Sequence, residues 1–288
     1  MWYYFDNQWV KNPCIAPQDR AFQYGDGIFE TIILRGGRAL FAADHYARLQ
    51  AGAEALGLDL PAYLPAKASG FAAWLAERGA EWQRLSGVAA PCLRLKIMLW
   101  RREGGLYGAT HADAHCMLGV RVQERLHDGE AIRVTLYDAY RLHAHPLAGV
   151  KRLAALPYVL AARHAQQTGF DDALLLDVEG HVAEATSSNL FWAVGDVFYT
   201  PALHTGCVAG IMRLQWLRYL HAQGIECRQV RLQPAQLMAR AEGCWLVNVT
   251  GVRSIQEIEG YKIPQGSEKQ SFVKAMQKAI WQKNTESR

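Results

Sequence analysis

The chain has 288 residues, half of them apolar and a fifth charged, which excludes a disordered protein and provides for a substantial core. Its 31 Lys and Arg exceed its 27 Asp and Glu by four, and this mild excess is spread along the chain, so nucleic acid and membrane surfaces are not expected as partners. Six widely spaced cysteines without a CxxC pair are typical of reduced cytoplasmic proteins. We expect no signal peptide and no membrane span.

Residues 1–123 have the pattern of a small α/β domain. Apolar, aromatic and β-branched runs at 2–10 and 28–41 predict strands. One amphipathic helix is predicted to begin at an Asp44 cap and to end near Gly57, and a second is predicted around residues 66–78.

The run from Cys92 to Trp100 predicts a half-buried strand with cations on one face. Leucine and isoleucine occupy every second position, and Arg94, Lys96 and Met98 alternate with them. A glycine-rich loop at 103–108 and a returning strand at 116–122 follow.

The polar stretch 124–130 is the predicted linker to a larger domain at 131–288. In that domain Pro157 opens a helix, since a proline is tolerated in the first helical turn. Further helices are predicted at 210–224 and 270–281, and strands at 131–139, 173–178, 181–185, 189–194, 197–200, 225–232, 243–249 and 254–258. The mixture predicts the α+β class in two units.

Three features between His145 and Arg213 belong together chemically. Lys151 precedes a helix, Glu184 lies in an apolar strand pattern, and a turn at 206–210 opens a second helix. A reactive amine, a buried carboxylate and a helix N-terminus are what a pyridoxal phosphate site requires, to bind the aldehyde, the pyridine nitrogen and the phosphate.

Several motifs in a fixed order resemble the fold-type IV, or class IV, aminotransferase family of pyridoxal-phosphate enzymes. This family includes branched-chain and D-amino-acid aminotransferases and 4-amino-4-deoxychorismate lyases. The resemblance implies two domains, the larger one built as a β-barrel-like sheet with flanking helices, and a homodimer with a shared active site. The motifs that carry it are YGDGIFET at 24–31, DHYARL at 44–49, HPLAGVK at 145–151, EGHVAEATSSNLFW at 179–192, TPAL at 200–203 and GCVAGIMR at 206–213.

The resemblance implies that Lys151 is the Schiff-base lysine and that Glu184 binds the pyridine nitrogen. A carboxylate between apolar neighbours needs a partner when it is buried, and a pyridinium would supply one. The phosphate contacts implied are the Arg48 side chain, the backbone N–H groups of Ile211 and Met212, and the Thr250 hydroxyl, with Asn248 as a second choice. Val208 would pack under the cofactor ring, and His45 and Asn189 would brace the local backbone.

On the substrate side, the resemblance implies that Tyr24, Phe29 and Glu30 line the pocket and that Tyr107 reaches across the dimer. The chain departs from the family at three positions. Leu156 stands where branched-chain enzymes carry tyrosine, and Leu106 and Ile33 stand where many members carry a carboxylate-binding arginine. Arg94 and Lys96 are the predicted replacements.

The function predicted first is transfer of an amino group between an amino acid, either a D-amino acid or one of the small or branched type, and a 2-oxo acid through a Lys151 Schiff base. The alternative is 4-amino-4-deoxychorismate lyase, which releases pyruvate and 4-aminobenzoate. A non-catalytic binding protein is disfavoured because both Lys151 and Glu184 are retained. His111, His115 and Cys116 lack a ligand geometry that would predict a metal site.

Overall fold

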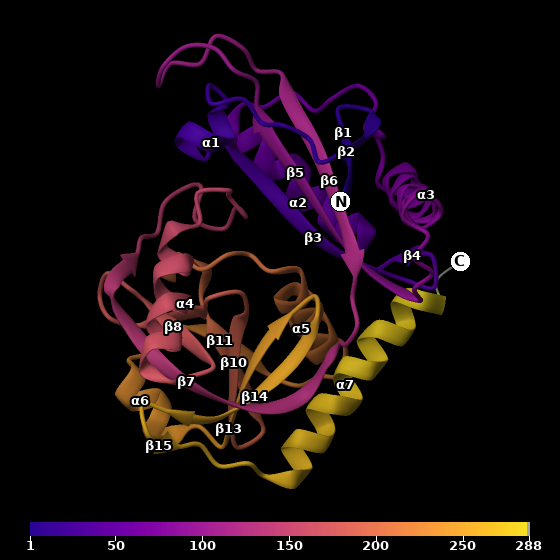
Figure 1. The fold of residues 1–288 in the computed structure, drawn as a ribbon. Helices are drawn as coiled ribbons and strands as arrows, with labels where there is room; N and C mark the ends of the chain where they lie inside the picture. Colours follow the sequence, from indigo (N-terminus) through magenta and orange to yellow (C-terminus); the bar gives the residue numbers. More distant parts are fainter. Residues whose placement is uncertain (287–288) are drawn as a thin grey trace. The chain divides into compact units, whose positions relative to one another are not determined.

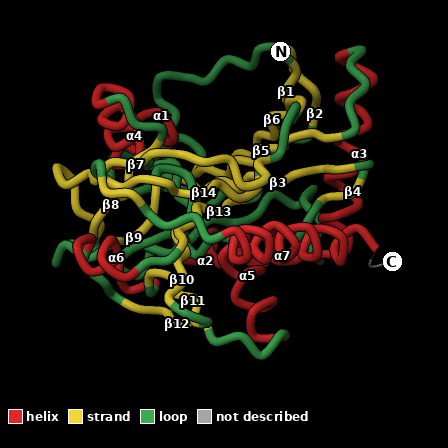
Figure 2. Tube along the Cα trace, turned by 90° about the horizontal axis from the view of Figure 1, so that it is seen from below, coloured by secondary structure: helices red, strands yellow, loops and turns green. Residues whose placement is uncertain are grey.

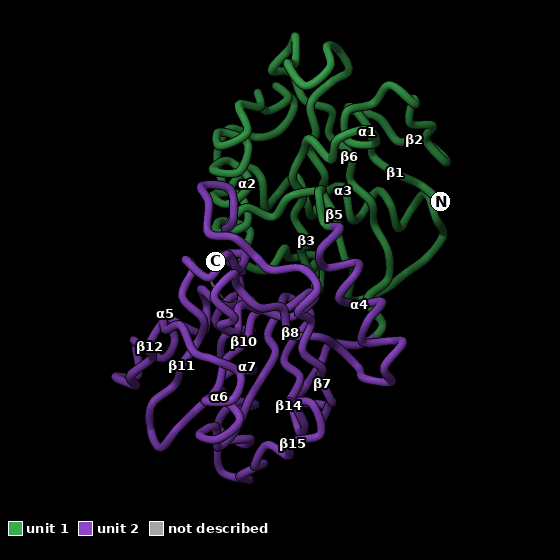
Figure 3. The backbone as a smooth tube through the Cα atoms, turned by 90° about the vertical axis from the view of Figure 1, so that its left-hand side faces the viewer, with its two compact units in different colours: residues 1–124, 150–155 green, residues 125–149, 156–288 purple. Residues whose placement is uncertain are grey.

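The computed structural model describes residues 1–286, which form two compact units (Figure 3). The first unit contains Met1–Glu124 together with Val150–Ala155. The second contains Arg125–Gly149 and the described residues from Leu156 onward. The segment with Lys151 thus belongs to the first unit, although it interrupts the sequence of the second.

The first unit is a six-stranded antiparallel sheet with helices (Figure 1). The strand order is β2-β1-β6-β5-β3-β4. The strands are β1 (Trp2–Phe5), β2 (Gln8–Lys11), β3 (Gly27–Arg35), β4 (Arg38–Ala39), β5 (Cys92–Arg101) and β6 (Ala114–Val122); the helices are α1 (Arg20–Tyr24), α2 (Ala42–Leu56) and α3 (Ala68–Ser86).

Alternation along the strands gives this sheet two different faces. On one face Ile32, Leu95 and Leu118 are buried together with Leu49 of α2 and Leu75 of α3. Successive strand residues point to opposite faces, so the residues between these apolar ones turn the other way. The second face therefore carries the cations of β5, as the alternation predicts.

Helix α2 begins three residues earlier than the sequence predicts. Its N-cap is Phe41, which has a positive φ of 54° and no side-chain cap. Asp44 lies inside the first turn, where its negative charge still interacts favourably with the helix dipole. The predicted cap was wrong because an aspartate suits either position.

The second unit is built on a curled nine-stranded mixed sheet, and its strands and helices can be followed in Figure 2. The order is β12-β11-β10-β13-β14-β7-β8-β9, with β15 paired to β14. The strands are β7 (His127–Leu142), β8 (Asp172–Asp177), β9 (Val182–Ala185), β10 (Asn189–Val194), β11 (Val197–Pro201), β12 (Cys227–Val230), β13 (Gly243–Asn248), β14 (Gly251–Ile258) and β15 (Tyr261–Lys262); the helices are α4 (Leu156–Thr168), η1 (Leu203–Thr205), α5 (Ile211–Ala222), α6 (Pro234–Arg240) and α7 (Ser267–Glu286).

The predicted α+β class is confirmed, and most predicted elements are found with shifted ends. Residues 127–130, predicted as linker, are the first residues of β7, which pairs in parallel with β14. Their polarity misled the prediction because this end of the strand is only partly buried. None of the helices within residues 1–286 has the length and apolarity needed to cross a membrane.

Leu95→Ala tests the core of the first unit. Leu95 is fully buried, so the truncation should lower the free energy of unfolding by about 2–5 kcal/mol through lost transfer energy and a residual cavity. Urea denaturation measures the change. The matched control is Leu85→Ala in the exposed last turn of α3; an equal loss in both variants would contradict the assignment of Leu95 to the core.

Candidate functional site

Lys151 is anchored along strand β3 of the first unit. Phe29 N–H donates to the Lys151 carbonyl at 2.9 Å, and Leu153 N–H donates to the Gly27 carbonyl at 2.8 Å. The Lys151 Nζ lies 4.7 Å from the centroid of the Phe29 ring. The backbone pairing therefore fixes the amine beside Phe29, on the face of the sheet that turns away from α2 and α3.

Three further cations occupy this face. Lys96 Nζ lies 4.6 Å from the same Phe29 ring, and Arg94 stands directly opposite Arg121 of β6. Partial desolvation and the charges of Arg94 and Arg121 lower the pKa of Lys96, and desolvation and Arg121 lower the pKa of Arg94. Among the side chains that the structure describes, those of residues 1–284, no acidic one forms an ion pair with these three cations. Uncompensated like charges at this spacing favour an anionic ligand.

Glu30 points to the opposite face from Phe29 and is 1% exposed. Arg48 donates to both carboxylate oxygens, from Nε to Oε1 at 2.7 Å and from Nη2 to Oε2 at 2.6 Å. His45 Nδ1 lies 2.6 Å from Oε2. Burial would raise the pKa of Glu30, but Arg48 and His45 outweigh it and hold the pKa at about 2. Burial also lowers the pKa of His45, which is therefore a neutral donor.

This arrangement gives Glu30 a different surrounding from the one the sequence predicts. Glu30 was expected on the wall of a substrate pocket, whereas here its carboxylate orients Arg48, the predicted phosphate ligand. The bidentate contact sets the plane of the guanidinium. A role of Glu30 in positioning Arg48 explains why one turn of α2 carries both His45 and Arg48.

Tyr24 and Tyr107 lie close together in the first unit. Their ring centroids are 5.6 Å apart, although Tyr107 is 89% exposed. The two predicted substrate residues, one at the end of α1 and one in the glycine-rich loop, thus form one aromatic pair.

In the second unit Glu184 is 4% exposed and accepts hydrogen bonds from three sides. The Tyr158 hydroxyl and the Val208 N–H donate to Oε1 at 2.7 and 2.9 Å, and Asn189 Nδ2 donates to Oε2 at 3.2 Å. Donors of this kind favour the ionised carboxylate, which is the form that binds a protonated pyridine nitrogen.

The turn before α5 is tied to this carboxylate. Asn189 Nδ2 also donates to the Val208 carbonyl at 2.9 Å, so Asn189 links Glu184 to the turn. Within the described residues, no side chain caps the N-terminus of α5, where Ile211 and Met212 begin the first turn. Backbone N–H groups at such an end suit a phosphate.

Thr250 lies in the turn between β13 and β14. Its hydroxyl donates to Asn248 Oδ1 at 2.6 Å, and its N–H donates to the same oxygen at 2.8 Å. Asn248 therefore fixes the position of Thr250. The phosphate contact of Thr250 stays a prediction.

Each unit carries groups of the kinds that bind parts of pyridoxal phosphate. The first has the Lys151 amine and the Arg48 guanidinium, and the second has the buried Glu184 carboxylate and the N-terminus of α5. Sequence reasoning missed Arg121 and Tyr158. Arg121 alternates with apolar Val120 and Val122, the same pattern that identified Arg94, whereas a tyrosine two residues into a predicted helix carries no comparable indication.

The pairing of Glu30 predicts a specific acid sensitivity. Its pKa is about 2 in the folded chain and about 4.3 in an unfolded one, so its contribution is present above about pH 4.3 and is lost as pH falls through about 2. We expect this carboxyl to account for on the order of 3 kcal/mol of lost stability over that range. Glu30→Gln should flatten the dependence of the unfolding free energy on pH, measured with urea between about pH 6 and 3. Glu54→Gln, at an exposed position of α2, is the control; equal slopes for both variants would contradict the assignment.

Gly210→Ala tests the link between Asn189 and the α5 turn. A Cβ at position 210 would lie 1.9 Å from Asn189 Oδ1, so Asn189 must leave Glu184 and Val208. Losing a hydrogen bond to a charged group should weaken pyridoxal phosphate binding by about 10- to 100-fold, measured by absorbance titration. Gly149→Ala, whose Cβ would lie 3.6 Å from Ala209 Cβ, is the control. Unchanged affinity in Gly210→Ala would show that this link is not needed.

The chain is similar to known proteins along most of its length. Residues 27–258 match the family described as Amino-transferase class IV. The chain is 27% identical to an aminodeoxychorismate lyase of Vibrio harveyi, over 86% of this chain and 87% of that protein. It is also 27% identical to a bifunctional aminodeoxychorismate lyase / D-amino acid transaminase of Mycobacterium tuberculosis, over 93% of this chain and 94% of that protein.

The fold is similar to that of solved fold-type IV enzymes. A branched-chain aminotransferase from Thermoproteus uzoniensis superimposes with a TM-score of 0.84 at 22% identity, covering 98% of this chain and 95% of that chain. The family match spans most of the chain, and its members use pyridoxal phosphate. The chain therefore belongs to the class IV amino-transferase family of pyridoxal-phosphate enzymes.

Proposed function

We propose that this enzyme acts on an amino compound with two carboxylates and that its reaction is that of an aminodeoxychorismate lyase. The observation that carries the proposal is the group of Arg94, Lys96 and Arg121 on the sheet face that also bears the Lys151 amine. Aminodeoxychorismate has two carboxylates and needs cations at two places. Similarity to the lyase of Vibrio harveyi along most of the chain supports the same choice.

Arg121 supplies a cation that compensates for the missing arginine at position 106. Many lyases carry a carboxylate-binding arginine in the loop where this chain has Leu106. Without that arginine, the cations predicted from the sequence are too few to bind both carboxylates of the substrate. Arg121 adds a third cation to the two predicted on β5. An arginine fork binds a carboxylate through two parallel hydrogen bonds, so a pair of arginines and a lysine can serve both carboxylates.

The reaction needs a proton acceptor and a held leaving group. Aminodeoxychorismate is converted to 4-aminobenzoate and pyruvate when the ether bond to the enolpyruvyl group breaks and a ring proton is lost, without an oxidant or a second substrate. Bound pyridoxal phosphate supplies an electron sink that stabilises the negative charge of the reacting carbon. Lys151 takes the proton, and the cations of β5 and β6 hold the carboxylates.

Several other residues bind the cofactor or line the substrate pocket. Arg48, oriented by Glu30, and the first N–H groups of α5 at Ile211 and Met212 bind the phosphate together with Thr250. Val208 packs under the ring, and Tyr24, Phe29 and Tyr107 line the substrate pocket. The working form is a cytoplasmic homodimer, in which Tyr107 serves the neighbouring subunit.

An aminotransferase is the second candidate. A dicarboxylate subsite also suits glutamate and 2-oxoglutarate, and the relative from Mycobacterium tuberculosis is named for both activities. In this case Lys151 moves the α-proton of the amino acid, and a 2-oxo acid must be present as acceptor for repeated turnover.

The two candidates differ in whether an acceptor is required. A lyase releases pyruvate from aminodeoxychorismate with no 2-oxo acid present, and coupling to lactate dehydrogenase measures the release. Lys151→Ala is the negative control. Turnover only after addition of a 2-oxo acid, with D- or L-amino acid donors, would support the aminotransferase; turnover with neither would refute both.

Loss of one cation should separate substrate binding from chemistry. Arg121→Ala should raise KM for aminodeoxychorismate by about 10- to 100-fold with a smaller effect on kcat, because a charge-assisted contact to the substrate is removed. KM of the parent enzyme should also rise with pH at a value below that of an ordinary lysine, as Lys96 loses its proton; Lys96→Arg should shift this rise to higher pH. Arg84→Ala, an exposed arginine of α3, is the control. An unchanged KM in Arg121→Ala would refute the subsite.

A further inference from the structure

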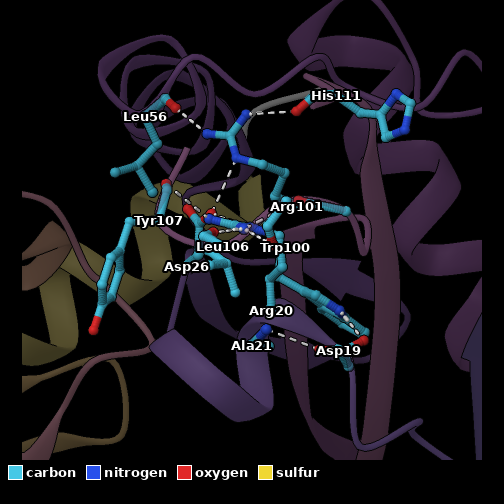
Figure 4. A network of polar contacts seen from close by, with 12 residues as sticks. Asp19, Arg20, Ala21, Asp26, Leu56, Trp100, Arg101, Leu106, Tyr107 and His111 are labelled. Carbon is cyan, nitrogen blue, oxygen red and sulfur yellow. Dashed lines mark hydrogen bonds and ion pairs between the residues drawn. The ribbon is translucent and has the colours of Figure 1, made fainter. Parts of the chain in front are cut away.

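Arg20 is a nearly fully buried arginine, 4% exposed, that no predicted role uses (Figure 4). It opens α1, whose N-terminus is capped by Asp19. Trp100 of β5 donates from Nε1 to Asp19 Oδ2 at 2.7 Å and thereby ties the helix to the sheet. The position of Arg20 is therefore set from both sides, by its own helix and by β5.

The Arg20 guanidinium binds a run of four backbone carbonyl oxygens. Nη1 donates to the carbonyls of Gly104, Gly105 and Leu106 at 3.2, 3.4 and 2.5 Å, and Nη2 donates to that of Tyr107 at 3.5 Å. The five N–H groups of arginine lie in a fixed fork, so one side chain can gather several acceptors that converge on it. Carbonyls of consecutive residues converge on one group only in a tightly curled backbone, and Figure 4 shows Arg20 beside Leu106 and Tyr107 of this loop.

Asp26 holds the guanidinium in place from the other side. Its Oδ2 accepts from Arg20 Nε at 2.9 Å and from Arg101 Nε at 3.0 Å. Arg101 in turn donates to the carbonyl oxygens of Leu56 and Gly57 at the end of α2. The carboxylate thus lies between two arginines and offsets part of their positive charge.

The loop backbone depends on glycine as well as on Arg20. Gly104 and Gly105 have positive φ values of 136° and 71°. A Cβ at Gly105 would lie 2.0 Å from the Gly108 carbonyl oxygen. Because glycine has no preference for one conformation, the sequence alone would leave this loop mobile. The convergent carbonyl contacts select one conformation.

In that conformation the loop presents its large side chains outward. Leu106 and Tyr107 are 77% and 89% exposed, while their carbonyl groups turn inward to Arg20. Tyr107 meets Tyr24, and the Arg20 guanidinium lies 5.0 Å from the Tyr24 ring on the same helix. A cavity of about 490 Å³ lies beside the network, lined in part by Arg20, Tyr24 and Tyr107.

We infer that Arg20 is a positioning residue for the substrate loop: it holds residues 104–107 in the conformation that places Tyr107 against Tyr24. Arg20 acts through the loop and touches neither substrate nor cofactor. The inference rests on the proposed function only for the statement that Tyr107 faces the substrate. The order that Arg20 imposes on the loop is independent of the reaction.

Hydrogen exchange measures this order in the full-length protein without substrate. Arg20→Lys keeps a cation beside Asp26 but cannot reach four carbonyls, so exchange of the amides of residues 104–108 should accelerate about tenfold or more. Arg102→Ala, which removes an arginine paired with Asp6 next to the loop, should leave that exchange unchanged. Unchanged exchange in Arg20→Lys would overturn the inference, whatever the enzyme's substrate.

Kinetics with the substrate identified by the pyruvate assay test the second part. Arg20→Lys should raise KM by about tenfold while kcat and pyridoxal phosphate affinity change by less than about threefold. Gly105→Ala disturbs the same loop without touching Arg20, and the double variant should be little worse than either single one, since both changes act on one element. Additive effects, or a parallel loss of cofactor affinity, would overturn the role in substrate positioning. Faster exchange with an unchanged KM would overturn it as well.

Discussion

The alternation of side chains along β3 is the constraint on which the first unit depends. Phe29 and Glu30 are neighbours in sequence but point to opposite faces of the sheet. Phe29 lies beside the amines of Lys96 and Lys151, whereas Glu30 pairs with Arg48 and His45. A shift of one residue in the pairing with β5 would exchange the two environments. Phe29 would then lie beside Arg48 and His45, and Glu30 would lose both partners and turn to the opposite face of the sheet. The long pairing of Gly27–Arg35 with Cys92–Trp100 fixes the register.

Three buried charges in this protein are stabilised in different ways. Glu30 is paired with a full positive charge, and its pKa falls despite burial. Glu184 accepts from a hydroxyl, an amide side chain and a backbone N–H. Arg20 is surrounded by carbonyl oxygens and one shared carboxylate. The first arrangement fixes a guanidinium, the second orients a carboxylate, and the third shapes a loop. Each charge is costly to bury and for that reason defines its surroundings closely.

The sequence predicted the parts of the site that depend on local pattern. The amine of Lys151, the buried Glu184 and the turn before α5 could each be identified from motifs and their neighbours. Arg121 shows the same alternation as Arg94 but was missed, and its place opposite Arg94 follows only from the register of β5 and β6. The surroundings of Glu30 depend on a helix that begins seven positions after β3 has ended, and the contacts of Arg20 depend on carbonyl groups 84 to 87 residues away. Every residue has a backbone carbonyl, so no sequence pattern predicts which carbonyls Arg20 binds.

The short excursion of residues 150–155 has a consequence for how the chain is made. The backbone passes from the first unit to the second after Glu124, returns at Val150 and leaves again after Ala155. As the chain emerges from the ribosome, the start of β3 has no backbone partner on one side until residues 150–155 have been synthesised. By then the first strand of the second unit has already been synthesised. The two units are thus interleaved during translation, and cleaving the chain at residue 124 would separate Lys151 from the strand that holds it.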